Sequence, residues 1–387
     1  MMEKHEILNL LNAKTADERL DNLKMLLQIE TEKPKSKPQF ANNHIHTFYS
    51  FSPYSPAAAI WFARAEGLQT AGIMDHDSIA GAEEFRAAGR LAGIGTTCGI
   101  ECRVSFAETP LGDKKLNNPD QAGIAYMAIH SIPSANYSKA QAVFESLRRK
   151  RNERNKVMTR RLDSITAPWG IRLDFERHVL PLSRHQEGGS VTERHILFAL
   201  ADRILRIVGR KNAAEFVRDC LRVHLSEKQE LLLSDTRNPY LQYDLLNVLK
   251  VSLLEQFYVP AAEECMSLAD AVKLTGELDA ILCYAYLGDV TDSPTGDKKA
   301  AKFEDDYLDE LFAVLNDAGV KAVTFMPSRN TKKQLSRVME LCEKHNMLQI
   351  SGEDVNSPRQ SFICRELEDP RFSHLIEATW SMVNREK

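Results

Sequence analysis

The sequence lacks several patterns that would point directly to a compartment or a cofactor. It contains no Cys-x-x-Cys pair, no Gly-x-Gly-x-x-Gly motif and no segment that repeats at a fixed period. Its seven cysteines are odd in number and lie apart, which is more typical of reduced thiols than of a disulfide framework. No stretch approaches the roughly 18 apolar residues that span a bilayer, and the first residues contain no apolar signal core. We therefore expect a cytoplasmic protein without a membrane-spanning segment.

A strong charge of either sign is also absent. The 50 lysines and arginines nearly balance the 54 aspartates and glutamates, and the net charge is -4, so the composition does not indicate a nucleic-acid or membrane partner. The exception is segment 148–161, where eight basic residues accompany one acid, Glu153. On a helix such a run is usually a solvated face. The alternative is a phosphate-rich or nucleic-acid partner, which is not favoured because aromatic residues for base stacking are missing.

The sequence does contain a long alternation of short apolar runs and amphipathic stretches, which is typical of βα repetition. With 387 residues, 43% of them hydrophobic, the chain can bury a large core. Residues 1–38 are predicted to form a helical arm and a linker, and residues 39–387 an α/β barrel. A mainly helical segment at about 193–260 is expected to be an insertion in this barrel, with a separate small domain as the alternative.

Histidines and acidic residues stand at the ends of predicted strands, where α/β barrels place their active sites. His44 and His46 lie two residues apart in one strand, so both imidazoles point to the same side and can bind one cation. The other members of the group are Asp75, His76, Asp77, Glu101, His130 and Asp354. Imidazole nitrogens together with carboxylate oxygens suit zinc, manganese or iron. The sequence therefore predicts a site for divalent metal ions.

These motifs read HIH at 44–46, MDHD at 74–77, GIE at 99–101 and GEDVN at 352–356. They resemble the motifs of the PHP (polymerase and histidinol phosphatase) family. Pro56 also opens the first helix after His44 at the spacing of the family's metal-dependent phosphoesterase branch. The resemblance extends from Asn42 to about Phe362 and is loose through the helical middle. It implies a PHP-type distorted (β/α)7 barrel that binds up to three divalent ions and hydrolyses phosphate esters.

Three positions depart from the family pattern. Phe51 stands where the branch has an aspartate, Asn356 where the last motif ends in histidine, and Tyr286 where an Ala-His-Pro turn has its histidine. The resemblance therefore implies a third metal site that has largely lost its ligands, where His76 binds weakly or contacts substrate. It also implies a second site that has lost a nitrogen ligand and gains an oxygen if Asp289 contributes.

The resemblance leaves one metal site complete. Its implied ligands are His44, His46, Glu101 and Asp354. Glu101 would bridge to a second ion, for which His130 is the candidate ligand after a local shift along its strand. We therefore expect one or two divalent ions, Mn, Zn or Fe.

Hydrolysis of a phosphate ester needs a general acid that protonates the leaving alkoxide, besides a metal-activated water. The candidates for this acid are Asp77, His195 and Tyr286. Arg194 and His195 resemble an Arg-x-His segment of the family, and both would then face the phosphate. In the alternative, Thr192 caps the helix and His195 is packed inside the protein.

Two further segments offer cations to a substrate phosphate. Arg359 lies on a proline-stiffened loop just past the last motif and could bind phosphate through two N–H groups. Lys298 lies in the segment SPTGDKKAAKFEDD, which does not have the full phosphate-loop pattern. An ordinary surface position is the alternative for both residues.

The leading hypothesis is a phosphomonoesterase or phosphodiesterase that acts on a small phosphorylated metabolite or nucleotide. One alternative is a nuclease that trims nucleic-acid ends. Another is a non-catalytic regulatory module whose barrel has lost part of its metal sites. The complete first site favours the enzyme. No membrane partner is expected, and the sequence does not indicate an oligomeric state.

Overall fold

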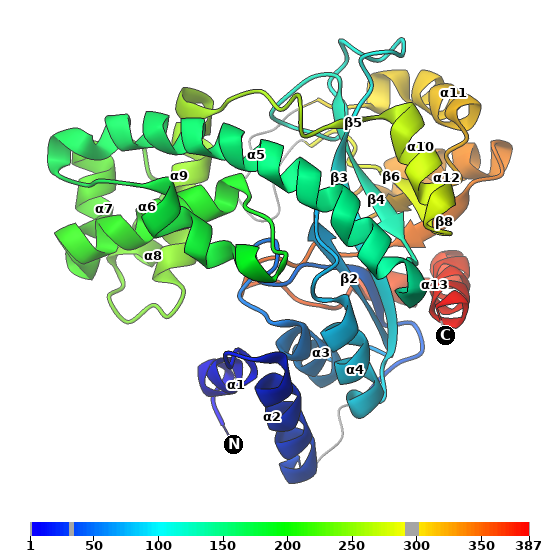
Figure 1. Cartoon of the computed structure of the whole chain (residues 1–387), viewed down its shortest axis with the longest axis horizontal. Coiled ribbons are helices and arrows are strands. Elements are labelled where there is room, and N and C mark those ends of the chain that lie inside the picture. Colours follow the sequence, from blue (N-terminus) through cyan, green and yellow to red (C-terminus); the bar gives the residue numbers. More distant parts are fainter. Residues whose placement is uncertain (1, 31–34, 291–301, 387) are drawn as a thin grey trace.

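The computed structural model describes residues 2–30, 35–290 and 302–386, which are arranged around one β-sheet (Figure 1). The strands are β1 (Ala41–Ile45), β2 (Thr70–His76), β3 (Gly95–Ser105), β4 (Ile124–His130), β5 (Met266–Ser267), β6 (Ile281–Ala285), β7 (Ala322–Phe325) and β8 (Leu348–Ser351). Their order in the sheet is β1-β2-β3-β4-β6-β7-β8, and the short β5 pairs with the carboxyl end of β3. The predicted α/β class is confirmed.

The sheet closes into a barrel where β1 meets the loop after β8. The N–H of His46 donates to the carbonyl of Val355 at 3.0 Å, and the N–H of Val355 donates to the carbonyl of His44 at 3.1 Å. Neighbouring strands on this path are parallel except at β4, which is antiparallel to both β3 and β6. The expected seven-stranded barrel is therefore present, and one of its strands is reversed.

Helices cover the outside of this barrel. They are α3 (Pro56–Ala65), α4 (Ala82–Ala92), α10 (Leu268–Glu277), α11 (Leu308–Ala318), α12 (Lys332–Lys344) and α13 (Ser373–Arg385). The start of α3 follows from its sequence, because the Ser55 hydroxyl accepts the N–H of Ala58 and Pro56 sets the backbone of the first turn. Among the described residues, no helix combines the length and the apolar character that crossing a bilayer requires.

The last helix, α13, covers one end of the barrel. It packs against β1, β3 and β8, and its Val383 lies beside Gly95, the first residue of β3. Met382 belongs to a cluster of buried side chains that has one residue from each of five strands: Met74, Ala128, Cys283, Ala322 and Ile350. Because α13 covers this end of the barrel, a substrate site is expected at the opposite end, where the carboxyl ends of the parallel strands lie.

The predicted N-terminal arm consists of α1 (Lys4–Leu11) and α2 (Ala16–Ile29), and the pair packs against α3 and α4. Arg19 of α2 is buried, and its guanidinium donates to both carboxylate oxygens of Glu84 in α4, at 2.9 and 2.6 Å. Such a two-point ion pair is strong as well as directional. It ties the arm to the barrel.

A second hydrophobic core lies beside the barrel, in a group of helices that we call the helical module (residues 158–259) (Figure 1). Its helices are the second half of α5 (Tyr137–Thr166), then α6 (Glu193–Val208), α7 (Ala213–Glu215), α8 (Glu227–Ser234) and α9 (Leu241–Phe257). Short helical turns at Phe175–Val179, Leu180–Ser183 and His185–Glu187 lead from α5 to α6. The core side chains begin at Met158 and include Phe51 from the barrel, so the module starts earlier than the predicted position near 193.

The basic run at 148–161 lies within α5 and is not a uniformly solvated face. Arg148, Arg151 and Arg154 recur at every third position of this helix and are buried. Arg151 forms an ion pair with Asp77, and Arg154 forms one with Glu193 at 2.7 Å. Part of the run therefore holds the helix against the barrel through buried ion pairs.

Candidate metal centre

Three of the predicted ligands meet at the open end of the barrel. His44 lies in β1 next to its last residue, His46 follows the strand, and Glu101 lies in β3. One ligating atom from each lies within 4.8 Å of the others, and all three residues are buried. The Nε2 atoms of both histidines lie 3.7 Å from Oε2 of Glu101. Two nitrogens and a carboxylate oxygen around one point are a suitable partial shell for a divalent ion.

Two more predicted ligands border this group. The pairing of β1 with the loop after β8 brings Oδ1 of Asp354 to 3.3 Å from Nε2 of His46. His76, which ends β2, places Nδ1 3.0 Å from Oε2 of Glu101. Asn356 contacts the group through Asp354, because its Nδ2 donates to Asp354 Oδ1 at 2.7 Å.

Unsatisfied polar atoms in the group fit a bound cation. Nε2 of His44 and Nδ1 of His76 are buried and make no well-directed hydrogen bond, although Oε2 of Glu101 lies 3.7 and 3.0 Å from them. Buried polar atoms almost always have a partner, and exceptions call for an explanation such as an ion. A divalent ion among His44, His46, Glu101 and Asp354 would be the missing partner of Nε2 of His44.

The protonation states also suit a metal. Burial alone would raise the pKa of Glu101, but the neighbouring imidazoles of His76, His44 and His46 outweigh it and lower the pKa to about 2. Burial lowers the pKa of His76 to about 3. For His46, burial is outweighed by Asp354, Glu101 and Asp75, which raise its pKa. A metal at His46 would therefore displace a proton, and binding should weaken as the pH falls.

A buried carboxylate behind the site orients His46. Asp75 accepts the N–H of Thr47 at 2.7 Å and the hydroxyls of Thr47 and Ser50 at 2.6 Å each. The Ser50 hydroxyl donates its hydrogen bond to Asp75. The oxygen of Ser50 therefore accepts a hydrogen bond from Nδ1–H of His46, 3.1 Å away. When His46 is neutral, as it would be with a metal bound, this hydrogen-bond order keeps its proton on Nδ1 and directs the lone pair of Nε2 to the site.

A cavity of about 540 Å³ opens from this group toward the helical module. Barrel residues on its wall include His44, His76, Glu101, Tyr126, Tyr286, Asp354, Asn356 and Arg359. Helices of the α5–α9 region contribute Arg151, Glu193, Arg194, Lys250 and Leu254. Its volume is typical of a site for a small molecule.

The three predicted general acids are all engaged in other contacts. Asp77 is buried, has a positive φ of 49°, and forms an ion pair with Arg151. Tyr286 lines the cavity, but its hydroxyl donates to Asp305. His195 is also buried, and neither it nor Asp77 is among the cavity residues.

The contacts of His195 match the structural alternative. Thr192 is the N-cap of α6, and its N–H donates to Nδ1 of His195 at 3.0 Å. The imidazole also meets the ring of Phe51 edge to face, with centroids 5.1 Å apart. Burial lowers the pKa of His195 to about 3. The imidazole is therefore a neutral packing residue where the helical module joins the barrel.

The predicted phosphate-binding residues have different surroundings. Arg194 lines the cavity and lies over the ring of Phe51, 5.0 Å from its centroid. Arg359 also lines the cavity, and it forms an ion pair with Asp244 of α9 at 2.7 Å. Lys298 lies outside the described residues.

The residues suggested for a second ion lie away from the cavity wall. His130 is buried, its Nε2 has no hydrogen-bond partner, and burial lowers its pKa to about 3. Because β4 is reversed, His130 ends this strand at the level where β6 begins, paired with Ile281. Asp289 accepts the N–H of Phe303 at 2.7 Å, and neither Asp289 nor His130 is among the cavity residues.

Sequence reasoning missed Tyr126, which lies near the start of the reversed strand β4 and lines the cavity beside His76. Tyr126 lies four residues before His130, and alternation along a strand places the two side chains on the same face. This spacing was the only sequence signal that could have pointed to Tyr126. Alternation alone does not reveal in which direction a strand runs, so this signal could not be used.

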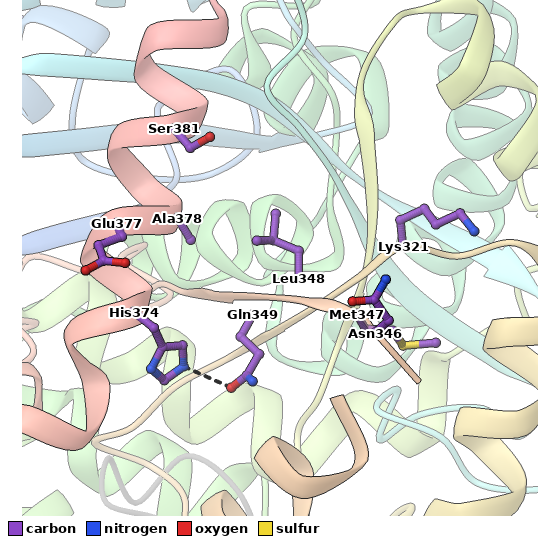
Figure 2. A pocket seen from close by; sticks show the side chains of 9 residues that line it. All are labelled: Lys321, Asn346, Met347, Leu348, Gln349, His374, Glu377, Ala378 and Ser381. Carbon is purple, nitrogen blue, oxygen red and sulfur yellow. Dashed lines mark hydrogen bonds between the residues drawn. The ribbon is translucent and has the colours of Figure 1, made fainter. Parts of the chain in front are cut away.

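A second depression, of about 600 Å³, is shallow and lies at the covered end of the barrel (Figure 2). Lys321, Leu348 and α13 border it, and His374 is hydrogen-bonded to Gln349 at 3.0 Å. It contains no group of metal-ligating side chains among the residues that line it.

Comparison with solved structures finds proteins of similar fold. One, from Bifidobacterium adolescentis, is described as a candidate metal-dependent phosphoesterase. It has 16% sequence identity and a TM-score of 0.56, and the match covers 92% of this chain and 98% of that one. Another is an amidohydrolase from Chromobacterium violaceum with bound sulfate and no metal. It has 18% identity and a TM-score of 0.53, and the match covers 85% of this chain and 95% of that one. No protein-family model and no curated protein matches the sequence. The chain therefore has the fold of two proteins described as hydrolases.

Proposed function

We propose that the protein is a metal-dependent hydrolase of phosphate esters of small molecules, and that it is a member of the PHP family. The observation that carries the proposal is the buried group of His44, His46 and Glu101 at the open end of the barrel. Asp354 is the fourth proposed ligand, and the number of ions is one or two. The sequence motifs and the fold of the two hydrolases support the same proposal.

A divalent ion in this group would supply an activated water and neutralise charge that develops on the phosphoryl oxygens. The residues of the chain orient a metal ligand and bind the phosphoryl group. Asp75 and Ser50 hold the imidazole of His46 in the tautomer that exposes Nε2. Arg194 and Arg359 on the cavity wall are the proposed N–H donors to a bound phosphoryl group, and Arg359 is held in place by its ion pair with Asp244.

The shape of the cavity favours a small substrate over a nucleic-acid strand. Its volume of about 540 Å³ suits a metabolite or a nucleotide. Arg148 and Arg154 of the basic run, moreover, are buried in α5 and are not among the cavity residues, so they are not offered to a phosphate backbone. We therefore propose a phosphomonoester or phosphodiester of low molecular weight as the substrate.

The test combines metal analysis with an activity assay. The purified protein should contain, or rebind after chelation, Mn²⁺, Zn²⁺ or Fe²⁺, and should hydrolyse p-nitrophenyl phosphate or its diester only when loaded. His44→Ala should lose metal and activity together. His374→Ala is the matched control, since His374 lies at the covered end of the barrel. Metal binding without any hydrolysis would favour a regulatory module, and the absence of both would refute the proposal.

A further inference from the structure

Tyr126 has a hydrogen-bonding arrangement that differs from that of the other tyrosine on the cavity wall, Tyr286. Its phenolic oxygen accepts two N–H groups of Arg103, from Nη2 at 2.9 Å and from Nε at 3.3 Å. A phenol has one O–H to donate and can accept at its oxygen. Because Arg103 donates to the lone pairs of the phenolic oxygen, the O–H of Tyr126 must point away from Arg103. In the described part of the chain, no side chain or carbonyl accepts it.

The position of this O–H is tied to the proposed metal centre through the sheet. Tyr126 is the partner of Arg103 in the register between β3 and β4, and the next pair on the same face is Ala128 with Glu101. The ring of Tyr126 lies 5.7 Å from the ring of His76, centroid to centroid, and both residues line the cavity. The phenol therefore stands one pair further out than Glu101, toward the space that a substrate would fill.

Both partners are held firmly. The backbone of Tyr126 exchanges two hydrogen bonds with the side chain of Asn117, at 2.7 and 2.8 Å. Arg103 is buried, and its Nη2 also donates to Glu193 at 2.7 Å, while Nη1 lies 3.6 Å from Glu264. The guanidinium therefore cannot turn away from the phenol without losing these ion pairs.

We propose that Tyr126 is a catalytic residue that donates its O–H to the leaving-group oxygen of the ester. This inference rests on the proposed function. In the step, water forms the new P–O bond, and the old P–O bond breaks with its electron pair going to the leaving oxygen. That oxygen takes the proton of Tyr126, and the phenolate regains one from the water's protons through solvent. The Arg103 guanidinium stabilises the negative charge that grows on the phenol during the transfer.

The test compares two esters that differ in their need for an acid. Nitrophenolate leaves without protonation, whereas an alkoxide does not, so Tyr126→Phe should spare one reaction and not the other. We expect kcat for n-propyl phosphate to fall by about 100-fold or more, and kcat for p-nitrophenyl phosphate to change only a few-fold. Metal content should equal that of the wild type.

A second measurement does not depend on turnover. Inorganic phosphate is titrated into the metal-loaded and the chelated protein by calorimetry. Tyr126→Phe should bind phosphate about tenfold more weakly in each form, because a hydrogen bond to a charged group is lost. The control is Tyr258→Phe. Tyr258 lies against Arg154 of the same ion-pair network, but its hydroxyl donates to Gln121 and it is not among the cavity residues.

The outcomes separate the two proposals. If the wild type hydrolyses both esters and Tyr126→Phe matches it on both, the role of Tyr126 is refuted while the proposed function stands. Equal loss on both esters, or loss of metal, would also refute it, because either indicates a structural role. If the loaded wild type hydrolyses neither ester, the proposed function fails and the acid role fails with it. Phosphate affinity that is unchanged in Tyr126→Phe would exclude even a hydrogen bond to the phosphoryl group.

Discussion

Replacing Asp75 by Asn should weaken metal binding, although Asp75 is not one of the proposed ligands. Asp75 is 1% exposed and accepts three hydrogen bonds, from Thr47 and Ser50. Asparagine has nearly the same shape, but it has no charge, and one of its two polar groups donates instead of accepting. The Ser50 hydroxyl is then held less strongly, and so is the tautomer of His46 that exposes Nε2.

The size of the effect follows from the contacts. A hydrogen bond to a carboxylate is roughly twice as strong as a neutral one, and loss of a partner behind a metal ligand typically costs about 10–100-fold in affinity. We therefore expect the Kd of Asp75→Asn for Mn²⁺ or Zn²⁺ to rise by about 10–100-fold, or about 1.4–2.7 kcal/mol. Calorimetric titration of the chelated protein near neutral pH measures it directly.

The control replaces a carboxylate of similar hydrogen bonding that lies far from the site. Asp163 in α5 accepts the N–H of Leu173 at 2.7 Å and two N–H groups of Arg172. Asp163→Asn should leave the Kd unchanged. If the Kd of Asp75→Asn lies within twofold of the wild type, the assignment of the His46 tautomer is wrong.

Three further substitutions test the packing of the arm, the helical module and the C-terminal end against the barrel. Arg19→Met leaves the buried carboxylate of Glu84 without its partner, and should lower the free energy of unfolding in urea by about 3–5 kcal/mol. Phe51→Ala opens a cavity in the core of the helical module and should cost about 3–5 kcal/mol in the same titration. Burial raises the pKa of Glu386 to about 8, against hydrogen bonds from Cys98, while its ordinary value is 4.5. Between these pH values the folded protein holds a proton that the unfolded chain has released, so stability falls as the pH rises, by up to about 1.4 kcal/mol per pH unit. Glu386→Gln should flatten this slope in thermal unfolding.

Each of these predictions has an outcome that contradicts it. Wild-type stability in Arg19→Met would show that the ion pair does not tie the arm to the barrel, whereas Arg19→Met with Glu84→Gln should recover part of the loss. Phe51→Ala should cost far more than Ile29→Ala, since Ile29 is 59% exposed, and equal costs would argue against the shared core. An unchanged slope in Glu386→Gln would mean that this carboxyl is not the group that titrates.

The candidate ligands could be recognised from sequence because the pattern that carries them is local. His44 and His46 share one side of a strand by the two-residue period alone, and this strand ends at Ile45 between them. The same reasoning points to Glu101 and Asp354, although β3 continues past Glu101 to Ser105 and Asp354 lies in the loop after β8. The carboxyl ends of parallel strands meet at one end of a barrel. The α/β class and the existence of a helical insertion also follow from local periodicity.

The proposed general acid could not be predicted from sequence, because the assignment depends on strand direction and on distant partners. A strand has the same alternation whether it runs up or down the barrel, so only the assembled sheet decides that Tyr126, and not His130, reaches the cavity wall. The partners of Asp77 and Tyr286 are likewise set by tertiary contacts.

The sequence by itself therefore determined the barrel and the group of side chains that would bind a metal. Both depend on periodicity within short segments. Only the tertiary structure decided which hydroxyls and carboxylates remain free to act on a substrate. Whether a hydroxyl or carboxylate is free depends on which buried charged side chain contacts it. The two contacting side chains come from elements far apart in the chain. Arg151 of α5 forms an ion pair with Asp77. Arg103 of β3 donates to the phenolic oxygen of Tyr126 and leaves its O–H free to donate.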